Sequence, residues 1–168
     1  MNLRRCIVGF VVALALVSAR AVDVGGVFEN LGTVVSLEGE PKGDGTVTLH
    51  GLLALEFDLA LGRKLYADTA RVELTQLDPL FRIECQDSAG TRTWSGQWKY
   101  REGYARTEDQ VNLIFRSKRY ENDGFLFILR TVNERKMLLV EVRRITSTWF
   151  GPVEKPVGTF LFDRVPGK

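Results

Sequence analysis

Apolar and polar residues alternate along the longest patterned stretch of the chain, residues 47–61 (VTLHGLLALEFDLAL). Apolar side chains occupy almost every odd position, whereas His50, Glu56 and Asp58 occupy even positions. A period of two is typical of a strand with one buried and one solvated face. The alternative is a helix, since Leu, Ala and Glu are good helix formers, but a helix would place Glu56 and Asp58 on opposite faces. We therefore predict a long strand, with Gly51 at a bulge or bend.

The same alternation recurs in shorter segments, which are separated by turns rich in Gly, Pro, Asn and Asp. Residues 125–132 are apolar on both faces at their start, which indicates a central position in a sheet. Residues 133–136 predict the turn of a hairpin, and Gly151, Pro152 and Pro156 bound a predicted loop. The predicted strands are residues 33–38, 47–61, 65–76, 80–86, 91–101, 111–116, 125–132, 137–148 and 157–164.

These nine strands, with no convincing helix after residue 22, predict an all-β fold. Strands joined by short turns form an antiparallel meander, whose edges are removed when it closes into a barrel or folds into two packed sheets. We favour a small up-and-down β-barrel, which resembles the architecture of lipocalin-like (calycin) barrels, over a two-sheet β-sandwich.

The first 21 residues have the pattern of a cleaved signal peptide. Two arginines precede an apolar run at residues 7–17, and a small-x-small cleavage site ends at Ala21. The predicted organisation is a leader at residues 1–21 and a single all-β domain at residues 22–168, in a secreted or periplasmic protein. An uncleaved anchor is the alternative.

Removal of this leader changes the charge balance. The full chain has 23 Lys and Arg against 21 Asp and Glu, and three of the arginines but none of the acidic residues lie in the leader. The mature chain would have 20 basic and 21 acidic residues, a net charge of about −1, which gives no general attraction to nucleic acid or anionic lipid. We expect no nucleic-acid partner and no stable membrane insertion after signal cleavage.

Few residues are available for catalysis or metal binding. His50 is the only histidine and Cys85 the only cysteine after the leader, so a His-rich zinc site and a multi-thiolate site are both excluded. The G-x-S-x-G motif of hydrolases is absent. We expect His50 on a solvated strand face, Cys85 as a small buried apolar residue, and Glu56 and Asp58 as surface charges. The sequence predicts a protein that is not an enzyme, with no catalytic residue, metal site or cofactor.

Aromatic residues give the most suggestive pattern. Trp94, Trp98 and Tyr100 share one face of the strand at 91–101, and Phe127 lies on a nearby candidate strand. The inward face of a small barrel either fills itself or encloses one ligand, so these rings predict a core or a ligand cavity. Arg130 is a candidate rim charge or carboxylate-binding group. These five residues are the predicted ligand-binding set.

Two functions follow from this reading of the sequence. The first is a secreted or periplasmic non-enzymatic binding protein that holds an apolar or amphipathic small molecule in a β-barrel. The second is a structural or assembly factor of the cell envelope, which binds another protein through a sheet face or edge. Residues 65–74 (LYADTARVEL) resemble a repeat of envelope lipopolysaccharide-transport proteins, and this resemblance implies the second function. A hydrolase is the least favoured alternative.

Overall fold

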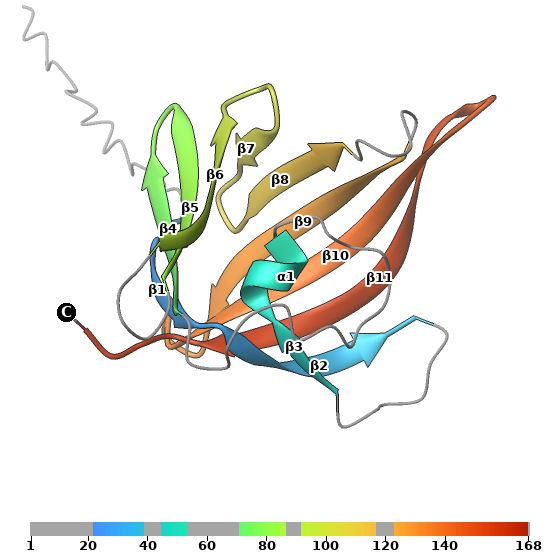
Figure 1. Cartoon of the computed structure of the whole chain (residues 1–168). Coiled ribbons are helices and arrows are strands. Elements are labelled where there is room, and N and C mark those ends of the chain that lie inside the picture. The colour runs from blue at the N-terminus through green and yellow to red at the C-terminus, as the bar shows by residue number, and fades with distance from the viewer. Residues whose placement is uncertain (1–21, 39–44, 54–70, 87–91, 117–122, 168) are drawn as a thin grey trace, which may run out of the picture.

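A computed structural model describes residues 22–38, 45–53, 71–86, 92–116 and 123–167. These residues form an all-β fold with two antiparallel sheets and one short helix, α1 (Leu49–Leu53) (Figure 1). The strands are β1 (Gly26–Glu29), β2 (Leu31–Leu37), β3 (Thr46–Thr48), β4 (Arg71–Leu77), β5 (Leu80–Gln86), β6 (Arg92–Lys99), β7 (Tyr104–Arg106), β8 (Val111–Arg116), β9 (Asp123–Val132), β10 (Met137–Thr148) and β11 (Gly151–Asp163). No helix in this described part is long and apolar enough to cross a bilayer.

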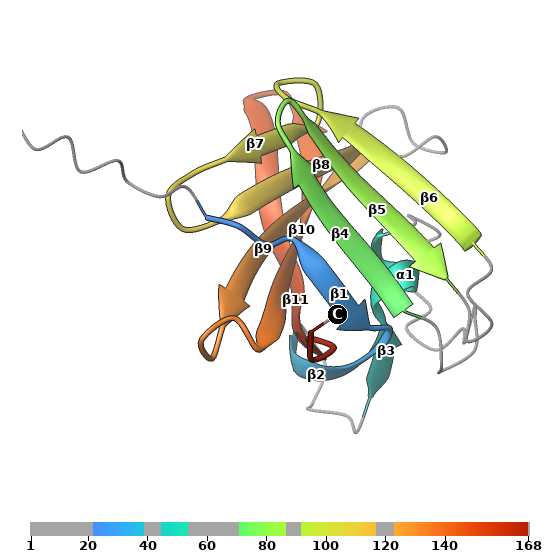
Figure 2. The same ribbon diagram turned by 90° about the vertical axis from the view of Figure 1, so that its left-hand side faces the viewer.

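The two sheets differ in size. The smaller has the order β1-β4-β5-β6 and the larger the order β3-β2-β11-β10-β9-β8-β7, and Figure 2 looks onto the smaller sheet with the larger one behind it. Strands β4 to β6 and β7 to β11 pair in chain order, as a meander predicts. Strands β1 and β2 do not pair with each other, because β1 pairs with β4, whereas β2 pairs with β11 and β3. The all-β prediction is confirmed, but the expected single meander is wrong, since the chain changes sheet at Asn30.

The two sheets are joined by isolated bridges at two places. On one side, Phe28 of β1 forms a bridge with Arg164, and the Val165 amide donates a hydrogen bond to the Val27 carbonyl (2.9 Å). On the other side, Tyr100 follows β6 and forms a parallel bridge with Tyr104 of β7. Within the described strands these bridges join the sheets without closing them into one barrel.

Side chains between the two sheets form the core. Strand β10 shows the expected alternation, with Leu138, Val140 and Val142 buried and the intervening residues partly exposed. Each large apolar side chain that is fully buried contributes about 1.5–3 kcal/mol. The largest members of this core outside α1 are Phe28, Leu74, Phe81, Ile83, Tyr104, Leu113, Phe127, Phe160 and Phe162.

The predicted strand at residues 47–61 is wrong where the structure describes it. Only β3, which ends at Thr48, is extended, and the chain then turns into α1. Leu49, Leu52 and Leu53 are each 0–1% exposed, and their spacing of three and four residues is the helical one. A strand would have placed Leu52 and Leu53 on opposite faces, whereas the helix buries both. Residues 54–61 lie outside the described part of the chain.

Hydrogen bonds at the start of α1 explain why the strand ends. The Thr48 hydroxyl accepts from the Gly51 amide (3.2 Å), as an N-cap threonine does. Asn30, which is fully buried, accepts from the Leu49 amide with its backbone carbonyl (2.7 Å) and from the His50 amide with its side-chain oxygen (2.9 Å). Three amides that a helix leaves unpaired are therefore satisfied. Gly51 lies inside this helix rather than at a strand bulge, and a Cβ there would lie 2.6 Å from the Thr48 hydroxyl.

The hairpin of β9 and β10 is confirmed, with residues 133–136 in the turn. Strand β9 pairs with both β8 and β10, so its predicted central position is also confirmed. The predicted loop at residues 151–156 is wrong, since β11 begins at Gly151 and runs through Pro152 and Pro156. A register shift separates this first half of β11 from the second. The short strands β1 and β7 were not predicted, and the leader at residues 1–21 lies outside the described residues.

Candidate functional site

The structure brings two of the five predicted ligand-binding residues into one aromatic row. The Phe115 ring centroid lies 4.6 Å from that of Trp98 on one side and 4.6 Å from that of Phe127 on the other. Phe127 is fully buried, and Trp98 is partly buried against the same core. Phe115, which sequence reasoning did not select, is therefore the residue that joins them.

The other three predicted residues lie apart from this row. Tyr100 is 42% exposed, and its ring contacts Tyr104 and the Arg101 guanidinium. Trp94 lies on β6, where its backbone pairs with Cys85, but its side chain lies outside the described part. Arg130 lies three residues after Phe127 on β9, so its side chain projects from the opposite face of the sheet.

Arg130 belongs to a charged network on the outer face of the larger sheet. Its guanidinium donates to the Gln110 side-chain oxygen through Nε (3.1 Å) and Nη2, and its Nη1 lies 3.7 Å from Glu141. Arg143 binds Glu141 (2.7 Å) and Glu154 (3.1 Å) in turn, and these hydrogen bonds raise its pKa. Two arginines and two glutamates balance in charge. The network links β9, β10 and β11, and each partly exposed pair stabilises the fold by at most about 1 kcal/mol.

His50 and Cys85 are both enclosed. His50, expected on a solvated strand face, is instead 4% exposed within α1, so that prediction is wrong. Cys85 is 1% exposed, as expected, and burial raises the pKa of its thiol to about 12. Glu56 and Asp58 lie outside the described residues. Among the residues described, no group of three or more His, Cys, Asp or Glu side chains could hold a metal ion.

A second polar cluster joins the turn between β4 and β5 of the smaller sheet to β7 of the larger sheet. The Tyr104 hydroxyl donates to an Asp78 carboxylate oxygen (3.1 Å), and Arg106 contacts the other oxygen (2.8 Å). Tyr104 is 1% exposed. Desolvation, followed by the hydrogen bond to Asp78 and the negative charge of Asp78, raises the pKa of Tyr104 to about 12. This cluster holds a neutral phenol in place at neutral pH and has the character of a structural contact.

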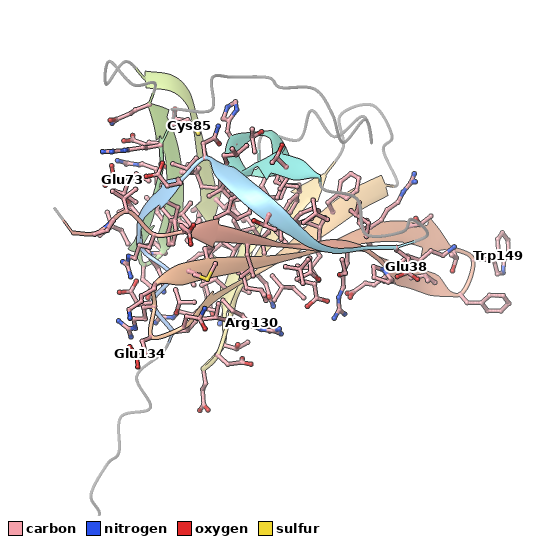
Figure 3. The ribbon with its side chains drawn as sticks, turned by 90° about the horizontal axis from the view of Figure 1, so that it is seen from below. Glu38, Glu73, Cys85, Arg130, Glu134 and Trp149 are labelled. Carbon is pink, nitrogen blue, oxygen red and sulfur yellow. The ribbon has the colours of Figure 1, made fainter. Side chains whose placement is uncertain are left out.

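The end of the β10–β11 hairpin carries the two most exposed large apolar side chains among the described residues. Trp149 and Phe150 form its two-residue turn and are 97% and 99% exposed. The hairpin extends past the neighbouring strands (Figure 1), and Trp149 lies at its far end, away from the body of the molecule (Figure 3). Turns normally carry Gly, Pro, Asn, Asp or Ser, so two large aromatic rings at this position call for another explanation. We name residues 145–153 the hairpin tip.

The ladder of β10 and β11 supports this tip. The two strands pair continuously from Met137↔Asp163 to Thr148↔Gly151, apart from the register shift, and β9 pairs with β10 as far as Thr146. The Thr148 hydroxyl also donates to the Gly151 carbonyl across the turn (2.7 Å). The rings are therefore held at the end of a paired ribbon rather than on a loop.

The edge of β11 beside the tip is poorly suited to pairing with another strand. Within the described residues, β2 pairs with β11 only at positions 158–161, so the first half of β11 pairs with β10 alone. This half contains Pro152, Lys155 and Pro156. Proline and lysine at an edge oppose the addition of a further strand, because proline has no amide donor and lysine carries a charge.

Comparison with known proteins gave no family assignment. No family model matches the chain, and neither a curated protein nor a solved structure matches it.

Proposed function

We propose that this chain is a non-enzymatic binding protein of the secreted or periplasmic compartment, which attaches to another component of the cell envelope through the β10–β11 hairpin. The observation that carries the proposal is the near-complete exposure of Trp149 and Phe150 at the end of a paired ribbon. Neither ring contributes to the core, and each exposes a large apolar surface to water. Aromatic residues in such positions are typical anchors for binding.

The ordered hairpin supports attachment through side chains. A paired ribbon that is already in its binding conformation loses little conformational entropy when it binds. Addition of a strand along the edge of β11 is disfavoured by Pro152 and Pro156. The tip rings are thus the favoured contact, rather than a sheet edge.

The absence of enzymatic activity is part of the same proposal. His50 is the only histidine in the sequence and Cys85 the only cysteine after the leader, and they are 4% and 1% exposed. A thiol whose pKa is raised to about 12 stays protonated at neutral pH and is a poor nucleophile. These observations favour binding over catalysis.

An enclosed apolar ligand in a lipocalin-like barrel is the second candidate function. It is favoured by the bridges at Phe28–Arg164 and Tyr100–Tyr104, which join the two sheets at two places. The burial of Phe127 in the core weighs against an enclosed ligand, because its ring already packs against the buried ring of Phe115. Native mass spectrometry of protein purified from its own host tests this candidate, and a retained small molecule would favour it over the hairpin.

Cell fractionation tests the attachment through the hairpin. The wild-type chain, the double variant Trp149→Ala/Phe150→Ala and the control Leu77→Ala would each be expressed in the native host. Leu77 is 59% exposed and lies in the β4–β5 hairpin, so its change removes apolar surface elsewhere. We expect the processed wild type and the control to sediment with the envelope, and the double variant to be released. Equal sedimentation of all three would show that the tip is not the attachment site.

A further inference from the structure

The hairpin tip is uncharged over its whole length. Residues 145–153 (ITSTWFGPV) contain no Asp, Glu, Lys or Arg. Besides Trp149 and Phe150, the tip exposes Val153 (41%). An apolar and hydroxyl-rich surface of this kind enters a medium of low polarity more readily than a charged one.

Charged residues bound the tip on one face. Arg144 and Lys155 pair directly with each other behind the tip, and Asp123 of β9 pairs with Thr146 of the tip. These positions share one face of the sheet. Lys155 is exposed. On the opposite face, Arg143 is matched by Glu141 and Glu154. Lys155 is therefore an exposed positive charge at the base of the tip.

We propose that the tip enters the interfacial layer of a lipid bilayer that contains anionic lipids, with Trp149 and Phe150 at the boundary between headgroups and acyl chains. This inference rests on the proposed function and names its partner. Five residues separate Phe150 from Lys155, about 16 Å along a strand at ~3.3 Å per residue. Amphipathic elements reach about 5–10 Å into this boundary. A tilted hairpin can therefore place the rings in the interface while Lys155 contacts anionic headgroups.

The shape of the tip favours a bilayer over a protein. A stable protein interface buries about 800 Å² on each partner, and its anchor residues are surrounded by contacts that contribute little energy but exclude water. A protruding two-residue turn offers little surface for such surrounding contacts, whereas insertion into the interfacial layer of a bilayer does not require them. Trp is also enriched at membrane–water interfaces because its ring is apolar with one polar edge.

The backbone of the tip also suits this environment. Polar backbone groups must find partners when water is removed. Thr148 and Gly151 pair in the ladder, and the Thr148 hydroxyl donates to the Gly151 carbonyl. Pro152 has no amide donor. Only the tip enters the interface, so the inference is compatible with the expectation that the mature chain has no stable membrane insertion.

Vesicle sedimentation with the full mature chain tests the inference. The vesicles would be phosphatidylcholine alone, or phosphatidylcholine with roughly 30% phosphatidylglycerol to provide a negative surface potential. We expect binding to the anionic vesicles, a loss of at least about tenfold for Trp149→Ala/Phe150→Ala, and no change for Leu77→Ala. Lys155→Glu should weaken binding to the anionic vesicles and leave binding to phosphatidylcholine unchanged, and added salt should weaken the wild type.

Fluorescence quenching by brominated lipids locates the ring. The wild type should show quenching that the variant Trp149→Phe lacks, since Trp94 and Trp98 remain in both proteins. Absence of wild-type binding, or equal binding by the double variant, would overturn the inference. If the vesicles stay unbound while sedimentation with the envelope still requires both rings, the partner is a protein, and the proposed function stands without the lipid. If neither assay depends on the rings, both proposals fall.

Discussion

Removal of the two tip rings should leave the stability of the fold unchanged. Trp149 and Phe150 are 97% and 99% exposed. Because such side chains bury about 150–250 Å² when enclosed, the remaining few per cent correspond to at most about 10 Å² of buried surface. At ~25 cal/mol per Å² this area contributes about 0.25 kcal/mol. We expect Trp149→Ala/Phe150→Ala to change the free energy of unfolding by less than about 0.5 kcal/mol, the usual range for surface substitutions.

Urea denaturation followed by far-UV circular dichroism measures this change without relying on the tryptophan signal. Phe162→Ala is the contrasting variant, because Phe162 is 0% exposed on β11 of the same hairpin and should lose about 3–5 kcal/mol. A loss above about 1 kcal/mol in the double tip variant would refute the reasoning. It would mean that the rings pack against the protein and are not available for binding.

Two further predictions concern the interior. Asn30→Ala removes the acceptor of the His50 amide, so the free energy of unfolding measured in urea should fall by about 1–3 kcal/mol. Thr46→Ala, a change at an exposed position, should alter this free energy little. Equal effects of the two substitutions would contradict the role of Asn30. The raised pKa of Tyr104, about 12 against a usual value of 10, predicts a stabilising contribution that is complete below pH ~10 and is lost as pH rises through 12. The stability of the wild type should therefore fall more steeply across this range than that of Tyr104→Phe, and parallel pH profiles would count against a raised pKa.

The strand segments could be predicted where their pattern was local. Strands β5 and β8 coincide with the predicted residues 80–86 and 111–116, because each is a run of alternating residues between turn formers. Strands β1 and β7 have only four and three residues, too few to show a period. Their pairing with β4 and β8 depends on contacts that the local sequence does not display.

Helix α1 shows where the local pattern was misleading. Leu49 and Leu53 fit a period of two as well as the period of a helix, so the leucines could not decide between them. The decision depends on the Thr48 cap and on Asn30, whose side chain lies twenty positions away in sequence from the amide it binds. The cap is a short-range signal that could have been used. The contact with Asn30 could not have been predicted without the fold.

The candidate site was only partly predictable for similar reasons. Alternation places Phe127 inward, as observed. The same alternation places Arg130, three residues later on the strand, on the opposite face. The tip rings were missed because Trp149 and Phe150 lie between the predicted strand at 137–148 and the predicted loop at 151–156, so no strand pattern included them. The usable signal was chemical: Trp149-Phe150 occupy a turn where small polar residues are expected, inside a nine-residue segment without charge.

The pairing that forms the hairpin also keeps its rings away from the core. Burying both rings against the body would stabilise the chain by roughly 1.5–3 kcal/mol each. To reach the body, the hairpin would have to bend sharply, but β10 is paired with β9 as far as Thr146 and with β11 as far as Thr148. Bending would break ladder hydrogen bonds and the contacts of Arg143 with Glu141 and Glu154. The ladder therefore keeps both rings exposed to solvent, which is the condition that the proposed attachment through the hairpin requires.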